Sequence, residues 1–345
     1  MRPEILVGDV GGTNTRLALA THSNGAWTLR DWEIYPTAEL SDMSQAVDRF
    51  LADHRPHSGT LPCCLSGAGP VRENVSHLSN VNWTIDGPQL ERRFDLHVLV
   101  INDFSAICYG LPALPRDDRQ ALVPIPHTDG TLGRRDGTVW AAVGAGTGLG
   151  IGFLVTMDGR HLALPSEGGH ALFGAFDEET QAMKAYVSAK LGSAPGSEQF
   201  VSGQGIVNAF EYLVQSGRYE RSEEVQAVID TPDDDRPAVI SNHAATDPCC
   251  SDAMALFVRM YGKVASNAAL TVLPSAGVFL AGGIAAKNES WFTERDDFMQ
   301  AFEDNYKESV RPFLRRCPVF IVKDTAVALL GAAHAAEQFL EEAAS

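Results

Sequence analysis

Hydrophobic and polar positions along the chain alternate between short β-like runs and helical spacings, a pattern typical of an α/β protein. Near the amino terminus, residues 4–10 and 15–21 are apolar runs that flank a polar turn containing glycine and predict a β-hairpin. A third strand is expected near 27–35, and helical spacing follows in 41–54 with a serine cap at its start. The elements expected next are a strand, a short helix and a strand: 62–69, 86–94 and 97–103.

The middle of the chain shows a change of organisation. Residues 114–137 are rich in proline, glycine and charge, and we expect this looser stretch to lead into a second domain. That domain opens in 138–155 with a strand, a glycine-rich turn and another strand, the same order as at the amino terminus. The elements expected afterwards are a long helix, a strand ending in glycines, a further strand and a closing helix: 252–273, 277–285, 318–324 and 325–343. We therefore predict an α/β fold with two related halves.

Two glycine-rich turns, Asp9 to Thr15 and Gly144 to Gly150, carry the first chemical signal. Backbone amides approach phosphate oxygens closely only where side chains are absent, and successive amides then form an anion site that small hydroxyl groups supplement. Both turns lie between two strands, whereas the Walker and Rossmann fingerprints join a strand to a helix. A tight hairpin explains either turn alone equally well, but the two together predict a clamp for the phosphates of ATP. The residues expected to form this clamp are Gly11, Gly12, Thr13, Asn14, Gly146, Thr147 and Gly148.

Asp9 stands near the end of the first apolar run. An aspartate at a hairpin most often bonds to local amides, and this alternative stays open. Beside a phosphate site, a carboxylate can instead hold Mg²⁺ directly or through water, because this ion keeps most of its waters and takes one or two carboxylates. Asp9 is therefore our candidate magnesium ligand.

Asn102 and Asp103 end a strongly apolar strand, and α/β proteins place ligands at the carboxyl ends of strands. A hydroxyl group that accepts a phosphoryl group needs a base for its proton and a polar neighbour that orients it. These two side chains supply both functions at one point. The alternative is that Asp103 only caps a helix beginning at Phe104.

Glu167 and His170 flank two glycines. This arrangement is compatible with a metal site, an acid–base pair or a site for sugar hydroxyls. A metal would need further His or Cys ligands at suitable spacing, and none is evident, so binding of sugar hydroxyls suits the residues better. Glu198 precedes another glycine turn and can add a second carboxylate to the same site.

Composition narrows the possible partners. The chain has 44 acidic and 27 basic residues and a formal net charge of −17, which opposes nonspecific binding to nucleic acid and to anionic membranes. It has no apolar stretch long enough for a membrane span and no signal-peptide pattern, so we expect a cytoplasmic protein. The six cysteines lack the spacing of a zinc site and are expected to be reduced.

Six segments, in this order, resemble the motifs of the bacterial glucokinase family, the ATP-dependent hexose kinases of the actin, sugar-kinase and heat-shock-ATPase superfamily. They are GDVGGTNTRLAL, INDFSA, GAGTGLG, EGGH, SGQGIVN and FLAGGI, and the resemblance extends from Leu6 to the closing helix. It implies an actin-like (ribonuclease H-like) α/β fold of two lobes with the active site in the cleft between them. It also implies a small domain of residues 1–113 plus 325–345, a large domain of residues 114–324, and a homodimer.

The activity implied is ATP-dependent phosphorylation of D-glucose at its 6-hydroxyl, giving glucose 6-phosphate and ADP at the entry to glycolysis. Position by position, Asp103 matches the family's catalytic base and Asn102 its sugar-binding neighbour. Glu167, His170 and Glu198 match the residues that bind sugar hydroxyls.

Other positions match the family less uniformly. Asn80 aligns with a loop near the sugar, although Ser79 replaces the usual threonine there, and Gln204 stands where relatives often have proline. Gly282 and Gly283 match the turn on the adenosine side. The segment after EGGH lacks the cysteine-rich zinc motif of related sugar kinases, so the chain resembles the zinc-free group.

Two alternatives stay open. Within the kinases, the acceptor can be another hexose or an amino sugar, because residues that bind hydroxyl groups do not reveal which epimer fits. Outside the kinases, the same fold serves actin-like ATPases and sugar sensors.

Overall fold

The computed structural model describes residues 3–23, 25–56, 59–78, 81–115, 117–219, 222–233 and 235–344. Within these ranges, no helix has the length and apolar character needed to cross a membrane. The chain forms two compact units: unit 1 comprises Met1–Arg116, Gly152–Pro165 and Asp324–Ser345, and unit 2 comprises Asp117–Ile151 and Ser166–Lys323. The division into domains 1–113 plus 325–345 and 114–324 stays a prediction; the units differ from it chiefly in the place of residues 152–165.

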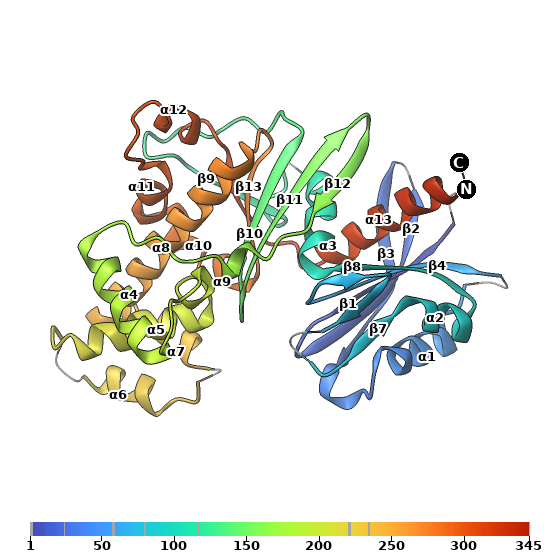
Figure 1. Ribbon diagram of the computed structural model, residues 1–345, viewed down its shortest axis with the longest axis horizontal. Helices are drawn as coiled ribbons and strands as arrows, with labels where there is room; N and C mark the ends of the chain where they lie inside the picture. The colour runs from blue at the N-terminus through green and yellow to red at the C-terminus, as the bar shows by residue number, and fades with distance from the viewer. Residues whose placement is uncertain are drawn as a thin grey trace. The chain divides into compact units, whose positions relative to one another are not determined.

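A five-stranded sheet in the order β3-β2-β1-β4-β8 forms the centre of unit 1 (Figure 1). The first three strands are antiparallel, and β4 and β8 continue the sheet parallel to β1. These strands are β1 (Ile5–Val10), β2 (Asn14–Ser23), β3 (Ala26–Pro36), β4 (Leu61–Gly67) and β8 (Leu96–Asn102). The predicted hairpin and third strand are thus confirmed. A separate three-stranded sheet contains β5 (Val71–Arg72), β6 (Val75–His77) and β7 (Thr84–Asp86).

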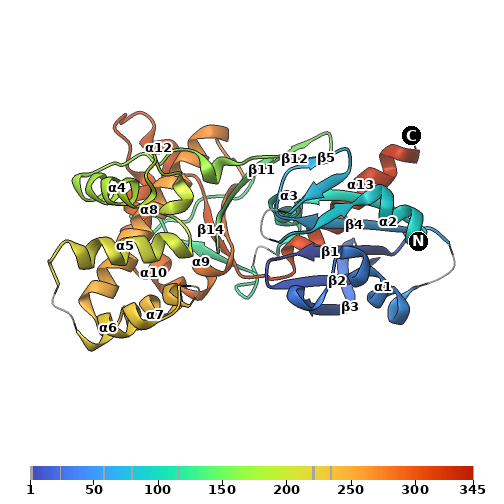
Figure 2. The same ribbon diagram turned by 60° about the horizontal axis from the view of Figure 1, so that its bottom comes forward.

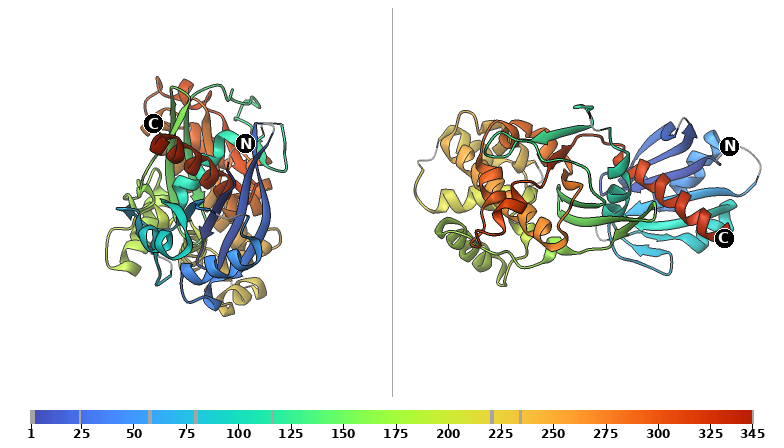
Figure 3. Two further views of the ribbon diagram at one scale, coloured as in Figure 1. Left: turned by 90° about the vertical axis from the view of Figure 1, so that its right-hand side faces the viewer. Right: turned by 90° about the horizontal axis from the view of Figure 1, so that it is seen from above.

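Helices cover both faces of the five-stranded sheet. Alternate residues of β1 point to opposite faces: Leu6 and Val10 pack with helices α1 and α2, whereas Ile5 and Val7 pack with α13. Figure 3 shows α13 lying along its face of the sheet. The helices of this unit are α1 (Met43–His54), α2 (Gly87–Phe94), α3 (Asp103–Gly110) and α13 (Val327–Ala344), with short 3₁₀ turns η1 (Thr37–Glu39) and η2 (Leu111–Ala113).

The start of α1 corrects one expectation. The sequence predicts a serine cap, but the N-cap is Asp42, whose carboxylate accepts a hydrogen bond from the amide of Gln45 at 2.9 Å. Asp42 has the extended backbone of a cap residue, whereas Ser41 lies one position too early and instead donates its amide to the Gln45 side chain at 2.7 Å.

A six-stranded sheet has the order β12-β11-β10-β13-β14-β9. Its strands are β9 (Leu122–Ile125), β10 (Val139–Ala145), β11 (Leu149–Met157), β12 (Arg160–Leu164), β13 (Gly277–Ala281) and β14 (Val319–Val322). Strand β9 lies inside the stretch that we expected to be irregular, and it pairs antiparallel with β14 at the edge of the sheet. Pro124 obscured the strand in the sequence, because proline is tolerated only at such edges.

The long helix α8 (Pro248–Val272) is the centre of the helical part of unit 2, and α5, α7, α10 and α11 pack against it (Figure 2). The remaining helices of the unit are α4 (Glu178–Leu191), α5 (Gly203–Gln215), α6 (Glu223–Asp230), α7 (Arg236–His243), α9 (Gly283–Lys287), α10 (Glu289–Thr293), α11 (Asp297–Glu303) and α12 (Arg311–Leu314). Two 3₁₀ turns, η3 (Gly168–His170) and η4 (Ser197–Gln199), complete it.

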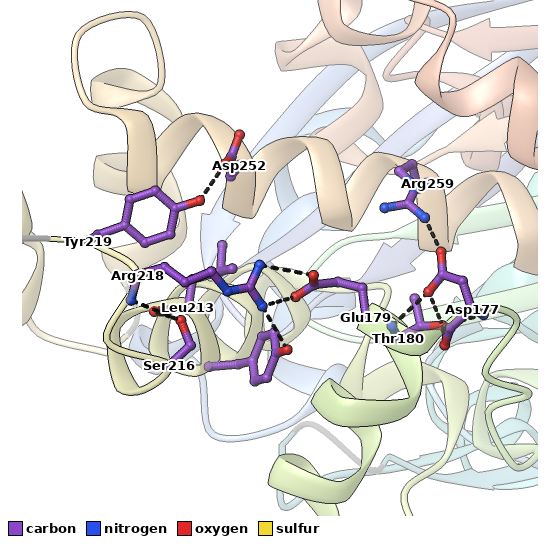
Figure 4. A network of polar contacts seen from close by, with 10 residues as sticks. Asp177, Glu179, Thr180, Leu213, Ser216, Arg218, Tyr219, Asp252 and Arg259 are labelled. Carbon is purple, nitrogen blue, oxygen red and sulfur yellow. Dashed lines mark hydrogen bonds and ion pairs between the residues drawn. The ribbon is translucent and has the colours of Figure 1, made fainter.

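A polar network joins α4, α5 and α8 (Figure 4). Arg218 donates to both carboxylate oxygens of Glu179, at 2.9 and 2.6 Å, and these bonds lower the pKa of Glu179. Asp177 caps α4 by accepting from the amide of Thr180 at 2.8 Å, and it also pairs with Arg259 of α8. Burial raises the pKa of Asp177, but the bonds from Thr180 and the charge of Arg259 outweigh it, so the pKa is lowered overall. Both carboxylates therefore favour the folded state in their ionised form.

Candidate active site

The carboxyl ends of β1, β4 and β8 meet at one edge of the sheet in unit 1. Asp9 of β1 lies beside Ser66 of β4, and Gly67 of β4 lies beside Asn102 of β8. Because neighbouring strands lie roughly 4.8 Å apart, the ends of β1 and β8 are about 10 Å from each other. The structure thus brings the first glycine turn, Asp9 and the pair Asn102 and Asp103 to the same edge.

The first glycine turn is closed by its own backbone. The amide of Gly11 donates to the carbonyl oxygen of Asn14 at 2.9 Å. Gly12 and Thr13, at the tip, are exposed, and in the part of the chain that the structure describes their amides make no hydrogen bond. Two successive amides without a protein partner, in exposed residues, are what a phosphate-binding turn requires.

Asp9 is held by side chains of the neighbouring strands. The Ser66 hydroxyl donates to one carboxylate oxygen at 3.1 Å, and the Arg16 guanidinium lies 3.4 Å from the other. Burial raises the pKa of Asp9, while Arg16 and the Ser66 hydrogen bond lower it. Burial is the largest of these effects, so the pKa is raised overall, and the side chain keeps 16% of its surface exposed.

Asn102 and Asp103 lie at the junction of β8 and α3. Asn102 is the N-cap: its side-chain oxygen accepts from the amides of Phe104 and Ser105 at 2.9 and 3.2 Å. The capping role that we considered for Asp103 therefore belongs to its neighbour, although Asp103 also accepts from the Phe104 amide at 2.8 Å. The side-chain nitrogen of Asn102 donates to the carbonyl oxygen of Gly69 at 3.2 Å. Asp103 thus presents its carboxylate at a helix N-terminus, where negative charge is stabilised.

The second glycine turn, in unit 2, is held by hydrogen bonds within the turn and from helices α5 and α8. Gly146 donates its amide to Gly148 at 2.9 Å, and its carbonyl oxygen accepts from the amide of Gly203, at the start of α5, at 2.8 Å. The buried Tyr261 of α8 supports the strand that leads into the turn, because its hydroxyl donates to Val143 at 2.9 Å and accepts from the Ala145 amide at 3.3 Å. Burial raises the pKa of this hydroxyl, which keeps its proton for the bond to Val143.

Glu198 reaches the second turn directly. One of its carboxylate oxygens accepts from the amide of Leu149 at 3.1 Å. A Cβ atom at Gly148 would lie 2.6 Å from the same oxygen, so only glycine lets the carboxylate approach. The predicted sugar ligand and the predicted phosphate turn are therefore in contact.

Glu167 and His170 lie on the adjoining η3 turn. Their side chains are 3.8 Å apart and about two-thirds exposed, at 65% and 66%. The turn packs closely against β11, because a Cβ atom at Gly169 would lie 1.9 Å from the carbonyl oxygen of Leu149. A hydrogen bond of 2.8 Å from the Ser197 amide to Ala171 joins η3 to η4, which carries Glu198. Unit 2 thus gathers the three predicted sugar ligands beside the second turn.

Gly282 and Gly283 follow β13, which is parallel to β10. Gly282 has a φ of +83°, and a Cβ atom there would lie 2.5 Å from the carbonyl oxygen of Ala145. Glycine is required for both reasons: it adopts this positive φ without strain, and it lets the turn lie against the strand that leads to Gly146. Asn80 and Ser79 lie outside the described residues.

No supporting role was expected from the sequence for five residues: Arg16, Thr37, Ser66, Gly203 and Tyr261. Among them, only Ser66 had a usable signal, since it is a polar residue at the end of an apolar strand. A cavity of about 430 Å³ among α4, α5 and α6 is lined by none of the predicted site residues.

Within the described ranges, no group of three or more His, Cys, Asp or Glu residues is placed to hold a metal ion by side chains alone. A single partly exposed carboxylate, Asp9, instead fits Mg²⁺ that is held mainly by phosphate oxygens and water.

Comparison with known proteins gives one consistent result. A family model described as Glucokinase matches residues 6–339. The chain is 33% identical to a glucokinase of Nostoc sp. over 343 residues, which cover 95% of this chain and 97% of that protein. It is 30% identical to a glucokinase of Photorhabdus laumondii over 331 residues, covering 94% of each.

Solved structures agree with the sequence relatives. A crystal structure of glucokinase from an Antarctic psychrotroph is 26% identical, with a TM-score of 0.81 over 98% of this chain and 100% of that one. A glucokinase from Balamuthia mandrillaris, solved in complex with glucose, is 23% identical and shares the fold with a TM-score of 0.74 over 97% of this chain and 94% of that one. These similarities confirm the predicted actin-like α/β fold. Together with the family model that matches almost the entire sequence, they show that the chain belongs to the glucokinase family.

Proposed function

We propose that this chain transfers the terminal phosphoryl group of ATP to the 6-hydroxyl of D-glucose, giving glucose 6-phosphate and ADP. Membership of the glucokinase family supports the reaction. The observation that carries it is the edge of the unit 1 sheet, where the first glycine turn follows β1 and the Asp103 carboxylate follows β8, with only β4 between these two strands. A base and a phosphate site at one edge are the two parts that phosphoryl transfer to a hydroxyl needs.

Each predicted residue has a role in this proposal. Asp103 accepts the proton of the 6-hydroxyl as the hydroxyl oxygen bonds to the terminal phosphorus and ADP leaves. Asn102 orients the sugar beside it, and Glu167, His170 and Glu198 bind further hydroxyl groups. Asn80 is proposed as an additional sugar contact.

The two glycine turns bind the phosphates of ATP. In the first turn, the exposed Gly12 and Thr13, whose amides have no hydrogen bond in the described residues, support this role, together with Gly11 and Asn14. In the second, Gly146, Thr147 and Gly148 take the same part. Gly282 and Gly283 lie beside the strand that leads to this turn, which supports their assignment to the adenosine side.

Asp9 is proposed as the residue that holds Mg²⁺, directly or through water. When bound with ATP, the ion would neutralise negative charge that develops on the phosphates during transfer. The partly exposed side chain of Asp9, on the strand that leads into the first turn, supports this placement.

We further propose that the chain acts as a homodimer, as the family resemblance implies, and that it is cytoplasmic, as its composition indicates. Measurement of its mass in solution by light scattering tests the dimer.

A coupled assay of ADP release tests the proposed reaction. We expect release that depends on both ATP and glucose, and a product that glucose-6-phosphate dehydrogenase oxidises. A panel of other hexoses and amino sugars identifies the preferred acceptor. ATP hydrolysis that is indifferent to any sugar would contradict the proposal and favour an actin-like ATPase.

A further inference from the structure

Thr37 lies directly behind the first glycine turn, although it is distant from it in sequence. It follows β3 and is almost fully buried, with 2% of its surface exposed. Its backbone amide donates to the carbonyl oxygen of Thr13 at 2.9 Å, and its hydroxyl donates to the carbonyl oxygen of Gly11 at 2.9 Å. One residue therefore holds both ends of the exposed tip.

The hydroxyl of Thr37 has a defined direction. It lies 3.1 Å from the hydroxyl of Thr15, which is fully buried. Because a hydroxyl has one proton and Thr37 gives its proton to Gly11, Thr15 donates to Thr37. The two threonines form a short chain of hydrogen bonds that ends on the carbonyl oxygen of Gly11.

The bonds to Thr37 set the direction of the turn amides. The carbonyl group of Gly11 and the amide of Gly12 belong to one planar trans peptide, so they point in opposite directions. A carbonyl oxygen held inward by Thr37 therefore turns the Gly12 amide outward. The same relation holds for the carbonyl group of Thr13 and the amide of Asn14.

We propose that Thr37 is a positioning residue that keeps the amides of the first turn directed at the phosphates of ATP. This inference rests on the proposed function, because it assumes that the turn binds ATP. Thr37 itself touches no substrate; it acts through Gly11 and Thr13. The hydroxyl, rather than the shape of the side chain, carries the effect.

Three variants separate the hydroxyl from its surroundings. Thr37→Val removes the hydroxyl and keeps the branched shape, whereas Thr37→Ser keeps the hydroxyl. Thr21→Val is the matched control, because the Thr21 hydroxyl pairs with the hydroxyl of Thr28 at 3.0 Å between β2 and β3, at the exposed end of these strands far from Thr37. If Thr37→Val does not fold, Thr37→Ala makes the same deletion with less bulk.

We expect kcat/KM for ATP to fall by about tenfold in Thr37→Val, with the KM for glucose within twofold of wild type. Thr37→Ser and Thr21→Val should both stay within twofold of wild type for ATP. Thr37→Val that keeps wild-type kcat/KM for ATP, or that raises both KM values equally, would overturn the inference. So would Thr37→Ser that is as impaired as Thr37→Val.

Calorimetric titration with Mg-ATP separates this inference from the proposed function. If the wild-type chain releases no ADP in the presence of sugars, the proposed function fails, but the titration still tests Thr37. Weaker Mg-ATP binding by Thr37→Val than by Thr37→Ser supports the inference, and equal binding overturns it.

Discussion

Gly169 offers a direct test of how the predicted sugar ligands are held. It lies in η3 between Glu167 and His170, and a Cβ atom there would be 1.9 Å from the carbonyl oxygen of Leu149. Ordinary contact begins at 3.4 Å, so in Gly169→Ala the η3 backbone and β11 must separate by about 1.5 Å. The atom that it meets belongs to the backbone, so no side-chain rotation relieves the contact.

This displacement moves Glu167 and His170 away from the second turn. A misplacement of about 1 Å can reduce catalysis by about 10²-fold, so we expect kcat/KM for glucose to fall by about 10²-fold. Overpacking of this kind costs about 1–3 kcal/mol of unfolding free energy. We therefore also expect a lower midpoint of thermal unfolding, by roughly 2–4 °C for each kcal/mol.

The assay is the coupled measurement of ADP release, with thermal unfolding followed in parallel. Gly174→Ala is the matched control: it makes the same change nearby in the same segment, but its Cβ atom would have no neighbour within 4 Å. We expect this control to match wild type in both measurements. Gly169→Ala with wild-type kcat/KM and an unchanged unfolding midpoint would refute the packing described for η3.

Three further predictions follow from other contacts. Tyr261→Phe removes two hydrogen bonds from the Tyr261 hydroxyl to the buried backbone of β10, and should lower the unfolding free energy, measured with urea, by about 1–3 kcal/mol. Asp9→Asn should raise the Mg²⁺ concentration needed for half-maximal turnover while the calorimetric Kd for glucose stays within twofold; equal metal dependence would contradict the magnesium role. The lowered pKa values of Asp177 and Glu179 mean that the unfolded chain binds more protons as the pH falls through about 4, so stability decreases in this range. A variant with Asp177→Asn and Glu179→Gln should lose less unfolding free energy than wild type between pH 6 and 3. The same change of unfolding free energy with pH in both proteins would show that these two carboxylates do not contribute.

The local features of the site could be predicted from sequence. Alternating apolar residues around Gly11 and Gly146 identified both hairpins, and the apolar strand before Asn102 identified the sheet edge. These features depend on neighbours in the chain, where periodicity and turn residues act directly.

The supporting contacts could not be predicted in this way. Ser66 reaches Asp9 only through the parallel register of β1 and β4, and Tyr261 reaches β10 from a helix more than a hundred residues away. At the start of α1, Ser41 and Asp42 are both common cap residues, and only the backbone conformation decides between them. The register between distant strands and the backbone angles at a helix start do not produce a periodic pattern in the sequence, so neither can be predicted from periodicity.

The central claim is that Asp103, at the edge of the unit 1 sheet, is the base for phosphoryl transfer to glucose. The most direct measurement is kcat of Asp103→Asn at saturating Mg-ATP and glucose, together with a calorimetric titration of glucose. We predict that kcat falls by about 10²- to 10⁴-fold while the variant remains folded and still binds glucose. A folded variant that binds glucose and turns over at close to the wild-type rate would contradict the claim.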